Sequence, residues 1–425
     1  MLSLRRFPLL LCWVTLLVNT SNAVADAEIA RQLFAENRSA ILQIRLIDLT
    51  SGSKSAIGSG FAIDHTGLIA TNYHVIQLAA SEPDQYRIEY VTESNQTGAL
   101  TLVDVDVIND LALVKAQQMV SQPIALASIE PKAGVPVFAL GNPLDLGLTV
   151  VPGTYNGINT SSYYPRVHFT GSLNSGMSGG PTLNQQGQVI GINVATAGNQ
   201  ISFLVPVAKL QQLVADYRAR GSAVTAVTDY IGSQLQADQQ QKMTLLLAAD
   251  WQSIALGQAQ VLQELPPFVN CWGGSNNTNS KAQFLSAERS CRSEDNIYLN
   301  AGFETGILEY QFFWLEADKL NSWQFYAVYE NLFGDFAPGN RATEDDVSEF
   351  HCDHDFITSA NQRQSKTVFC TRAYKDYPGL YDSLFLQGTV DDSDKALITH
   401  FTLAGVSKEN SLRFARRFME VSQWR

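Results

Sequence analysis

Serine, histidine and aspartate occur in three separate short motifs whose residue types suit nucleophilic catalysis. Ser178 lies within Gly176-Met177-Ser178-Gly179-Gly180-Pro181. Its small and turn-forming neighbours leave room for a carbonyl group and two backbone N–H groups to meet at the hydroxyl. A serine hydroxyl is a weak nucleophile, so it needs a base that removes its proton and a carboxylate that orients the base.

Candidates for the base and the carboxylate lie upstream of the serine. His74 occurs in Thr71-Asn72-Tyr73-His74-Val75, after the apolar, glycine-punctuated stretch 58–63, and Asp110 directly precedes the apolar run 111–114. Asp104 and Asp106 compete for the carboxylate role, and Asp110 alone directly precedes the apolar strand. Taken singly, a histidine after tyrosine is more often structural and a serine between glycines is more often part of a turn. Together, in the order His, Asp, Ser, the three motifs are candidates for a catalytic triad.

The elements that must position these residues are short strands. Residues 27–34 have the spacing of a short amphipathic helix, and 40–49 alternate as a first strand. Strands broken by Gly, Asn and Asp follow at 59–64, 67–71, 86–91, 100–106 and 111–115, and a second series runs from 135–140 to 202–205. Regular short strands of this kind predict antiparallel barrels rather than a doubly wound parallel sheet.

Two further blocks complete a family pattern. They are Ala139-Leu140-Gly141-Asn142-Pro143, and Gly191-Ile192-Asn193 followed by Ile201-Ser202-Phe203-Leu204-Val205-Pro206. Over roughly residues 28 to 220, the five ordered blocks resemble the trypsin-like serine proteases, and specifically their HtrA/Deg-type branch. The resemblance implies a mainly β protein with a chymotrypsin-like double β-barrel and an active site between the barrels. His74 and Asp110 would come from the first barrel and Ser178 from the second. The backbone N–H groups of Gly176 and Ser178 would form the oxyanion hole.

Met177 departs from this family pattern, which usually has Asn or Asp beside the nucleophile. In digestive-type relatives an Asp there forms a buried ion pair with the N-terminus created by zymogen cleavage. Methionine cannot form that ion pair, so the oxyanion loop must be ordered in another way. The departure also leaves open a protein that binds without cutting.

The same resemblance suggests a specificity pocket. Ser172, six residues before the nucleophile, would form the base of the S1 pocket, and Val194, Ala195 and Thr196 would line one wall. Such a pocket has no carboxylate for Lys or Arg, so we expect small aliphatic P1 residues. The alternative is that a shifted loop from 155–167 supplies another residue to the pocket.

The first residues are typical of an export signal. Arg5 and Arg6 precede the apolar stretch 7–18 and the small-residue exit 23–25, which predicts a cleavable signal peptide over residues 1–25. Removing its two arginines takes the formal charge from −12 to −14, which argues against nucleic acid or anionic lipid as the main partner. No later apolar run is long enough to span a membrane, so we expect no stable membrane insertion.

The predicted organisation is a protease domain at 26–220, a linker and helical connector at 221–267, and a C-terminal domain of unknown type at 268–425. Residues 230–264 are interpreted as one or two helices. In the C-terminal region strands are predicted at 307–315, 323–329, 367–372, 384–390 and 397–403, with a helix at 411–421. HtrA-type proteases usually carry PDZ domains here, but no carboxylate-binding glycine loop is present.

Four cysteines remain after processing, all in the last third of the chain. We hypothesise pairs Cys271–Cys291 and Cys352–Cys370, which close the shortest loops of the three possible connectivities. The alternative is a metal cluster at His351-Cys352-Asp353-His354 with Cys370, since all these residue types are ligands. We prefer disulfides in an exported protein and predict no metal or other cofactor.

Together these features predict an exported serine endopeptidase, periplasmic or extracellular, that cleaves unfolded or exposed protein segments. Its partners would be protein or peptide substrates. The sequence leaves the oligomeric state open. The alternative is a catalytically inactive protease-fold binding or chaperone-like protein. Hydrolysis of something other than a peptide is a third reading.

Overall fold

The computed structural model describes residues 15–118, 121–198, 201–265, 269–334, 336–359 and 362–424, with the side chains of 15–25 and 195–198 left out. The predicted signal peptide therefore lies largely outside the described residues. The chain forms two units. The first comprises Met1–Asp104, Leu111–Ile158 and Arg166–Ala223; the second comprises Val105–Asp110, Asn159–Pro165 and Val224–Arg425.

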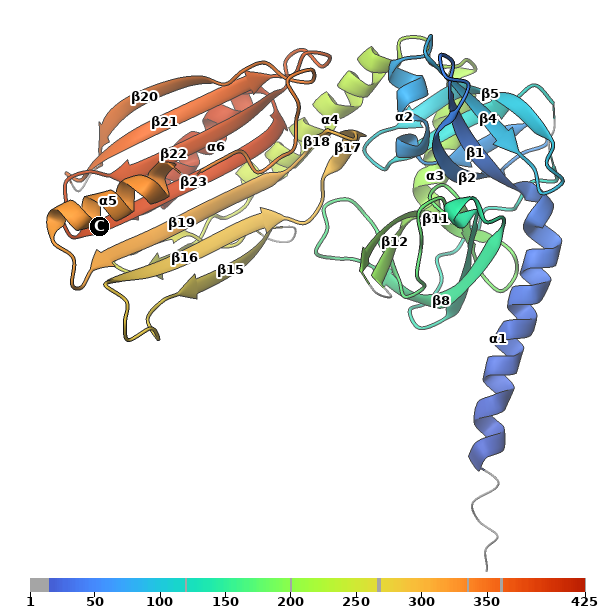
Figure 1. The fold of residues 1–425 in the computed structure, drawn as a ribbon, viewed down its shortest axis with the longest axis horizontal. Coiled ribbons are helices and arrows are strands. Elements are labelled where there is room, and N and C mark those ends of the chain that lie inside the picture. The colour runs from blue at the N-terminus through green and yellow to red at the C-terminus, as the bar shows by residue number, and fades with distance from the viewer. Residues whose placement is uncertain are drawn as a thin grey trace, which may run out of the picture. The chain divides into compact units, whose positions relative to one another are not determined.

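The first unit contains the two predicted antiparallel barrels, each closed by six strands (Figure 1). The strands of the first barrel, in the order β1-β2-β3-β6-β5-β4, are β1 (Ile41–Asp48), β2 (Lys54–Ala62), β3 (Leu68–Thr71), β4 (Tyr86–Val91), β5 (Thr97–Asp106) and β6 (Leu111–Ala116). Those of the second, in the order β10-β11-β12-β9-β8-β7, are β7 (Pro136–Gly141), β8 (Thr149–Ile158), β9 (Val167–Phe169), β10 (Pro181–Leu183), β11 (Val189–Gly198) and β12 (Ile201–Pro206). Buried side chains from both barrels pack into a shared core that includes Phe61, Leu113, Phe138 and Leu183.

The described part of the first unit also contains three α-helices and two short 3-10 helices. They are α1 (Thr15–Asn37), α2 (Tyr73–Ser81), α3 (Val207–Arg220), η1 (Arg38–Ala40) and η2 (Pro143–Asp145). Helix α3 buries Leu210, Leu213 and Val214 and ends at Gly221, which has φ +72°. A left-handed glycine at this position is a common way to end a helix. Among the described residues no helix is both long and apolar enough to cross a membrane.

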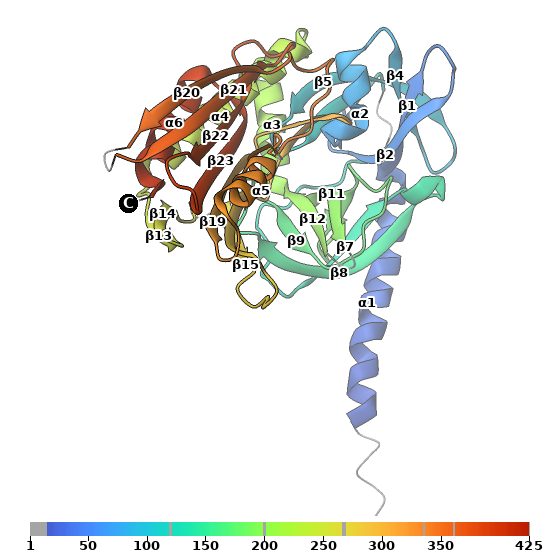
Figure 2. The same ribbon diagram turned by 60° about the vertical axis from the view of Figure 1, so that its left-hand side comes forward.

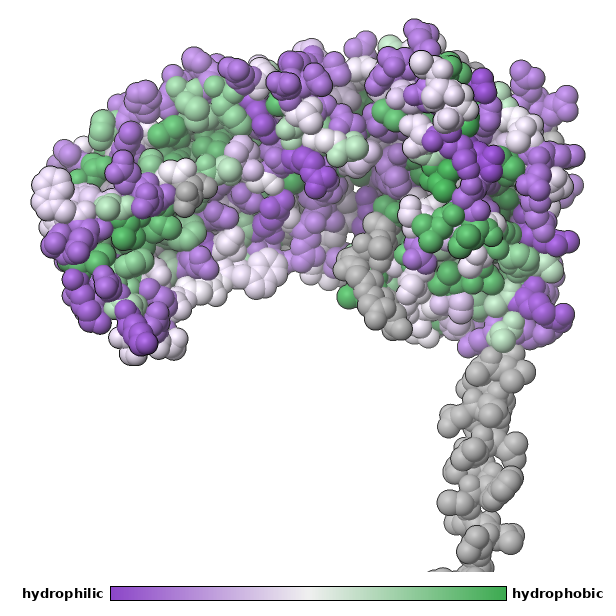
Figure 3. Space-filling model, in the orientation of Figure 1, coloured by the Kyte–Doolittle hydropathy of each residue, from purple (hydrophilic) through white to green (hydrophobic). Residues whose placement is uncertain are grey.

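The second unit is built on an antiparallel sheet of seven strands in the order β15-β16-β19-β23-β22-β21-β20. Its strands are β15 (Val269–Ser275), β16 (Phe284–Ser293), β19 (Leu308–Ala317), β20 (His351–Thr358), β21 (Gln364–Ala373), β22 (Tyr381–Thr389) and β23 (Lys395–Val406). Smaller sheets pair β17 (Ile297–Asn300) with β18 (Phe303–Thr305), and β13 (Ser253–Leu256) with β14 (Ala259–Leu262) and β24 (Gln423–Trp424). Figure 3 shows polar residues over much of the visible surface, with apolar residues in separate areas.

Helices cover both faces of the seven-stranded sheet (Figure 2). On one face, Phe414 and Phe418 of α6 (Lys408–Val421) pack with Phe312 and Phe401. On the other, Phe325 and Tyr329 of α5 (Ser322–Gly334) pack with apolar residues of the sheet. Helix α4 (Val227–Ala248) contributes Met243 and Leu246 to the first of these cores.

Two predictions for this region are wrong. Residues 323–329 lie in helix α5, not in a strand, because Asn321 and Gln324 cap the helix reciprocally: the Gln324 N–H donates to Asn321 Oδ1 (3.0 Å), and the Asn321 N–H donates to Gln324 Oε1 (3.1 Å). Of the one or two helices predicted over 230–264, α4 is present and ends at Ala248, while the rest forms the hairpin of β13 and β14 instead of a helix. Its turn contains Gly257 at φ +57°, a conformation that glycine adopts readily.

The structure contains both hypothesised disulfides, Cys271–Cys291 and Cys352–Cys370. In each case the two cysteines are directly opposite on neighbouring strands, β15 with β16 and β20 with β21, with Cα atoms 4.0 Å apart. The disulfides therefore link both edge strands of the seven-stranded sheet to their neighbouring strands. Each disulfide stabilises the folded protein by about 3 kcal/mol.

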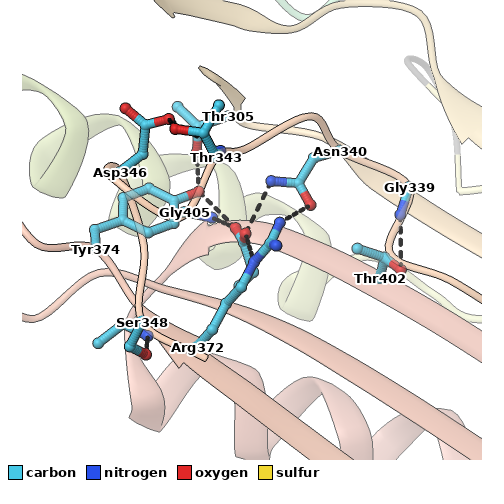
Figure 4. Close-up of polar contacts among 12 residues, drawn as sticks. Thr305, Gly339, Asn340, Thr343, Asp346, Ser348, Arg372, Tyr374, Thr402 and Gly405 are labelled. Atoms are coloured by element: carbon cyan, nitrogen blue, oxygen red, sulfur yellow. Dashed lines mark hydrogen bonds and ion pairs between the residues drawn. The ribbon is translucent and has the colours of Figure 1, made fainter. Parts of the chain in front are cut away.

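Asp382 on β22 is buried and accepts hydrogen bonds from Arg372, Asn340, Tyr374 and Gly405, which are labelled in Figure 4. One carboxylate oxygen accepts from Arg372 Nε (2.8 Å) and Asn340 Nδ2 (2.9 Å), and the other accepts from Tyr374 OH (2.5 Å). The Gly405 N–H adds a fourth, longer bond of 3.3 Å. Because the buried charge is paired and both oxygens are hydrogen-bonded, the network avoids the cost of an isolated buried carboxylate.

A second buried polar side chain, His400 on β23, is less well satisfied. Its Nε2 lies 3.2 Å from Thr402 Oγ1, while Nδ1 has no hydrogen-bond partner among the described residues. The ring is 1% exposed and packs against Phe336. Burial lowers the pKa of His400 from 6.5 to about 4.

Because His400 is buried in its neutral form, we expect the protein to lose stability in mild acid. Between pH 6.5 and about 4, the unfolded chain binds a proton at His400 that the folded chain excludes. The contribution is complete above pH 6.5 and is lost as pH falls through that window, amounting to on the order of 3 kcal/mol. Urea unfolding at several pH values should show a shallower pH dependence for His400→Gln than for the wild type. The exposed His351→Gln should keep the wild-type slope, and equal slopes for all three proteins would contradict the prediction.

Candidate active site

His74 is the second residue of α2, just after β3 ends at Thr71. Asn72, at the N-cap position of α2, has an extended backbone, and the Thr71 hydroxyl donates to the Ser59 carbonyl at 2.7 Å. Asn72 and Tyr73 are buried, whereas His74 is half-buried. The strand-to-helix transition thus leaves the imidazole partly accessible on a fixed backbone.

Asp110 lies at the turn between β5 and β6. Thr71 of β3 pairs with Ala112 of β6, so this register puts the chain positions of Asp110 and His74 at the same end of the two paired strands. Asp110 is buried and has φ +60°, a left-handed conformation that aspartate tolerates better than most residues.

The two competing aspartates have other partners. The buried Asp104 forms an ion pair with Arg220, which is exposed, at 2.6 Å. Asp106 accepts hydrogen bonds from the backbone N–H of Asn109 (3.0 Å) and from its side-chain Nδ2 (2.7 Å), so it closes the turn that leads to Asp110. The assignment of Asp110 as the orienting carboxylate remains a prediction.

The loop that carries Ser178 is hydrogen-bonded to Ser59 of the first barrel. The Ser59 hydroxyl donates to the Gly176 carbonyl (2.7 Å) and accepts from the Asn142 N–H (2.8 Å). The Ser59 N–H donates to the Ser178 carbonyl at 2.7 Å. One buried serine thus fixes the backbone on both sides of Met177.

Close packing brings the histidine segment and the serine segment together. A Cβ atom on Gly179 would lie 2.2 Å from the Ser59 carbonyl oxygen, 2.4 Å from Thr71 Oγ1 and 2.9 Å from the Asn72 nitrogen. A Cβ on Gly58 would lie 2.5 Å from the Val75 side chain and 3.2 Å from the Ser178 carbonyl oxygen. Only glycine fits at these two positions, and the absence of side chains lets the segments touch.

The backbone around the predicted oxyanion hole is anchored from outside. The Ser175 carbonyl accepts the Leu144 N–H at 2.9 Å, and Gly176 has φ +92°. In a trans peptide the carbonyl and the N–H point in opposite directions, so the Gly176 N–H is directed away from Leu144. Neighbouring Asp145 is held by Lys54 and by Gln43 Nε2 (2.8 Å), and these bonds, with the Lys54 bond the stronger, lower its pKa.

Met177 orders the loop by apolar packing. Its side chain is fully buried in the core of the second barrel together with Phe169, Leu173 and Leu204. Its carbonyl accepts from the Gly180 N–H (3.0 Å) and from Asn193 Nδ2 (3.3 Å). A buried methionine thus stands at the sequence position where digestive-type relatives have the aspartate of a charged pair.

The residues proposed for the S1 pocket have different surroundings. Ser172 is exposed and Val194 is half-buried. Ala195 and Thr196 lie on β11, where their backbones pair with Phe203 and Ser202 across a bulge. Their side chains lie outside the described part of the structure, so the pocket remains a prediction.

The alternative metal cluster lacks its cysteines. Cys352 and Cys370 are joined in a disulfide, and His351 and His354 are exposed on β20. In the described ranges, no three His, Cys, Asp or Glu side chains lie close enough together to hold a metal ion.

Sequence reasoning missed two residues that shape the site, Ser59 and Asn193. The Asn193 Nδ2 donates to the Leu140 carbonyl (3.0 Å) and its Oδ1 accepts from the Thr182 hydroxyl (2.7 Å). Both residues are fully buried, and both lie inside the glycine-containing blocks of the family pattern. A polar residue in an otherwise apolar strand was the available signal.

Comparison with known proteins finds relatives of the segment that carries these residues. A family model described as a trypsin-like peptidase domain matches residues 58–192, about a third of the chain. Serine protease HTR4 of Rattus norvegicus is 34% identical over 177 residues, covering 39% of this chain and 35% of the relative. Serine protease HTRA1B of Danio rerio is 32% identical over 194 residues, covering 42% of this chain and 39% of the relative. The matching segment is a trypsin-like peptidase domain of the HtrA type.

The chain spans less than half of the length of these curated relatives. Among solved structures, the Yersinia pestis serine endoprotease is similar at a TM-score of 0.40 and 26% identity, covering 45% of this chain and 68% of that chain. Deg5 is similar at 0.39 and 28%, covering 44% of this chain and 92% of that chain.

Met177→Ala should destabilise the protein and disorder the nucleophile loop. Truncating a buried methionine costs about 2–5 kcal/mol, and here the cavity opens directly under the loop. We expect lower stability in urea and slower labelling of Ser178 by a fluorophosphonate probe. Ile190→Ala removes a buried side chain from the same core but outside the loop. This control should lose comparable stability while labelling at the wild-type rate; equal labelling of both variants would show that Met177 has no special role.

Proposed function

We propose that this protein is a serine endopeptidase that cleaves unfolded or exposed protein segments, with Ser178 as nucleophile, His74 as base and Asp110 as the orienting carboxylate. The observation that carries the proposal is the packing of Gly179 against Thr71 and Asn72, which brings the serine loop to the histidine segment. The match of this region to a trypsin-like peptidase domain supports the same assignment.

In the proposed reaction, His74 removes the proton from the Ser178 hydroxyl as its oxygen bonds to the peptide carbonyl carbon. The histidine then returns that proton to the amide nitrogen as the C–N bond breaks, leaving an acyl-enzyme. Water, activated by the same histidine, releases the second product and regenerates the serine. Asp110 stabilises the imidazolium ion that forms in each step.

The N–H groups of Gly176 and Ser178 are proposed to stabilise the oxyanion. The loss of one such donor typically costs about 3–4 kcal/mol of transition-state stabilisation. Ser59 and Met177 position these N–H groups through the backbone. Ser59 donates hydrogen bonds to the carbonyls of Gly176 and Ser178, and the side chain of Met177 is buried between them in the sequence.

Export to the periplasm or the extracellular space is part of the proposal. The two disulfides support it, because disulfides form and persist in oxidising compartments. We infer that residues 268–425 select or present protein substrates to the protease domain.

A non-catalytic binding protein is the second candidate, and one contact favours it. The Ser178 hydroxyl donates to the Val194 carbonyl at 3.0 Å. For catalysis this hydroxyl must leave that acceptor and turn its proton toward the base. A protein in which it stayed there would keep the substrate cleft and lose turnover.

Ser178→Ala should abolish proteolysis and leave folding intact, because it removes one hydroxyl and creates no appreciable cavity. Casein degradation and labelling by a fluorophosphonate probe distinguish the endopeptidase from the non-catalytic binding protein. The matched control is Ser175→Ala, an exposed serine in the same loop. The control should cut and label like the wild type. A wild-type protein that neither cuts nor labels would support the binding protein instead.

Cleavage should occur after small aliphatic residues such as Ala or Val. An uncharged Ser172 leaves a Lys or Arg side chain unpaired, at a cost of several kcal/mol. A cleavage-site profile on a denatured protein mixture tests this, and Ser172→Asp should raise the share of cuts after Lys and Arg. A dominant basic preference in the wild type would exclude Ser172 as the pocket base.

A further inference from the structure

Helix α4 holds the segment that ends at Asp110. The Val107 N–H donates to Gln234 Oε1 at 2.9 Å, and Gln234 Nε2 donates to the Val105 carbonyl at 2.7 Å. Both partners belong to the second unit, although residues 105–110 comprise the end of β5 and the connection to β6 of the first barrel. A single side-chain amide thus satisfies two backbone groups in the way a neighbouring strand would.

Val107 in turn determines where Asp110 lies. The Asp110 N–H donates to the Val107 carbonyl at 3.4 Å, and the Asp106 carboxylate closes the turn through Asn109. Asp110 itself has φ +60°, and left-handed backbone in a non-glycine residue persists only where its surroundings enforce it. Gln234 therefore hydrogen-bonds to the backbone three residues before the proposed catalytic carboxylate.

A second element approaches the same segment. Tyr298 of β17 is half-buried, and its pKa is raised first by burial and then by the charges of Asp110 and Glu304. Strand β17 and helix α4 both belong to the part of the chain beyond residue 224. Asp110 is thus in electrostatic reach of residues that lie far from the protease motif in the sequence.

We propose that Gln234 is a positioning residue for the reaction assigned to Ser178, by fixing the backbone from Val105 to Asp110. This inference rests on the proposed function, because it takes Asp110 as the carboxylate of the triad. Its consequence is that helix α4, in the connector after the protease domain, influences the turnover of that domain.

Gln234→Ala removes both hydrogen bonds and should lower kcat by about 10- to 100-fold, the range expected when a catalytic group is displaced by up to about 1 Å. KM should change little, since the residue is remote from substrate. Gln234→Glu keeps the acceptor for the Val107 N–H and lacks the donor for the Val105 carbonyl, so it should fall between Gln234→Ala and the wild type. Gln236→Ala is the control, because that side chain lies on the same helix and donates to the Pro378 carbonyl instead.

The pH profile separates positioning from mere folding. A displaced carboxylate stabilises the imidazolium less, so the acid limb of kcat/KM should move to lower pH in Gln234→Ala. Titration with a fluorophosphonate probe gives the fraction of folded, competent enzyme, and the kinetic constants are divided by that fraction.

The outcomes are distinct. A wild type that does not react with the probe overturns the proposed function itself. Reactive wild type with an unchanged kcat and acid limb in Gln234→Ala overturns the positioning role alone. A loss of activity fully explained by fewer titratable sites, with an unchanged limb, also overturns it.

Discussion

The nucleophile loop depends on one buried side chain, Ser59. Its hydroxyl bridges the Gly176 carbonyl and the Asn142 N–H, and its backbone N–H holds the Ser178 carbonyl, so a strand of the first barrel carries the loop of the second. Without that hydroxyl, two buried backbone groups lose a partner, at about 1–3 kcal/mol each. The glycines at 58 and 179 matter for the same reason, because any side chain there would separate the segments that Ser59 joins.

Met177 supplies the remaining constraint by a different kind of force. Burying a methionine side chain is worth about 1.5–3 kcal/mol, and that contribution requires no new N-terminus and no titratable partner. Met177 therefore uses apolar packing at the position where digestive-type relatives use a charged pair. It orders the loop between Gly176 and Ser178 in a chain whose protease domain follows a long N-terminal helix, α1.

The barrels and the order of the three motifs could be predicted because their signals are local. Alternating strands broken by Gly, Asn and Asp set the element boundaries, and the paired cysteines were found on neighbouring strands. Residues 323–329 were predicted as a strand because of their aromatic content. They form a helix instead, and the reciprocal cap between Asn321 and Gln324 was the signal for it. The contact of Gln234 with Val105 and Val107 spans more than 120 residues, and no local pattern records such a partner.

A second connection of the barrels, residues 159–165 between β8 and β9, also belongs to the second unit. There Tyr164 OH donates to Asp238 (2.7 Å), and Lys242 Nζ lies over the Tyr163 and Tyr164 rings and donates to the Gly306 carbonyl (2.5 Å). Burial lowers the pKa of Lys242 to about 8 against the opposing charges of Asp238 and Asp295, so the amine remains largely protonated at neutral pH. Because α4 supplies both Gln234 and Lys242, one helix holds a connection from each barrel. The two connections and α4 therefore form a single packed assembly, and a protease domain cut at residue 223 would leave Tyr163, Tyr164 and the Val105–Asp110 segment without the partners that order them.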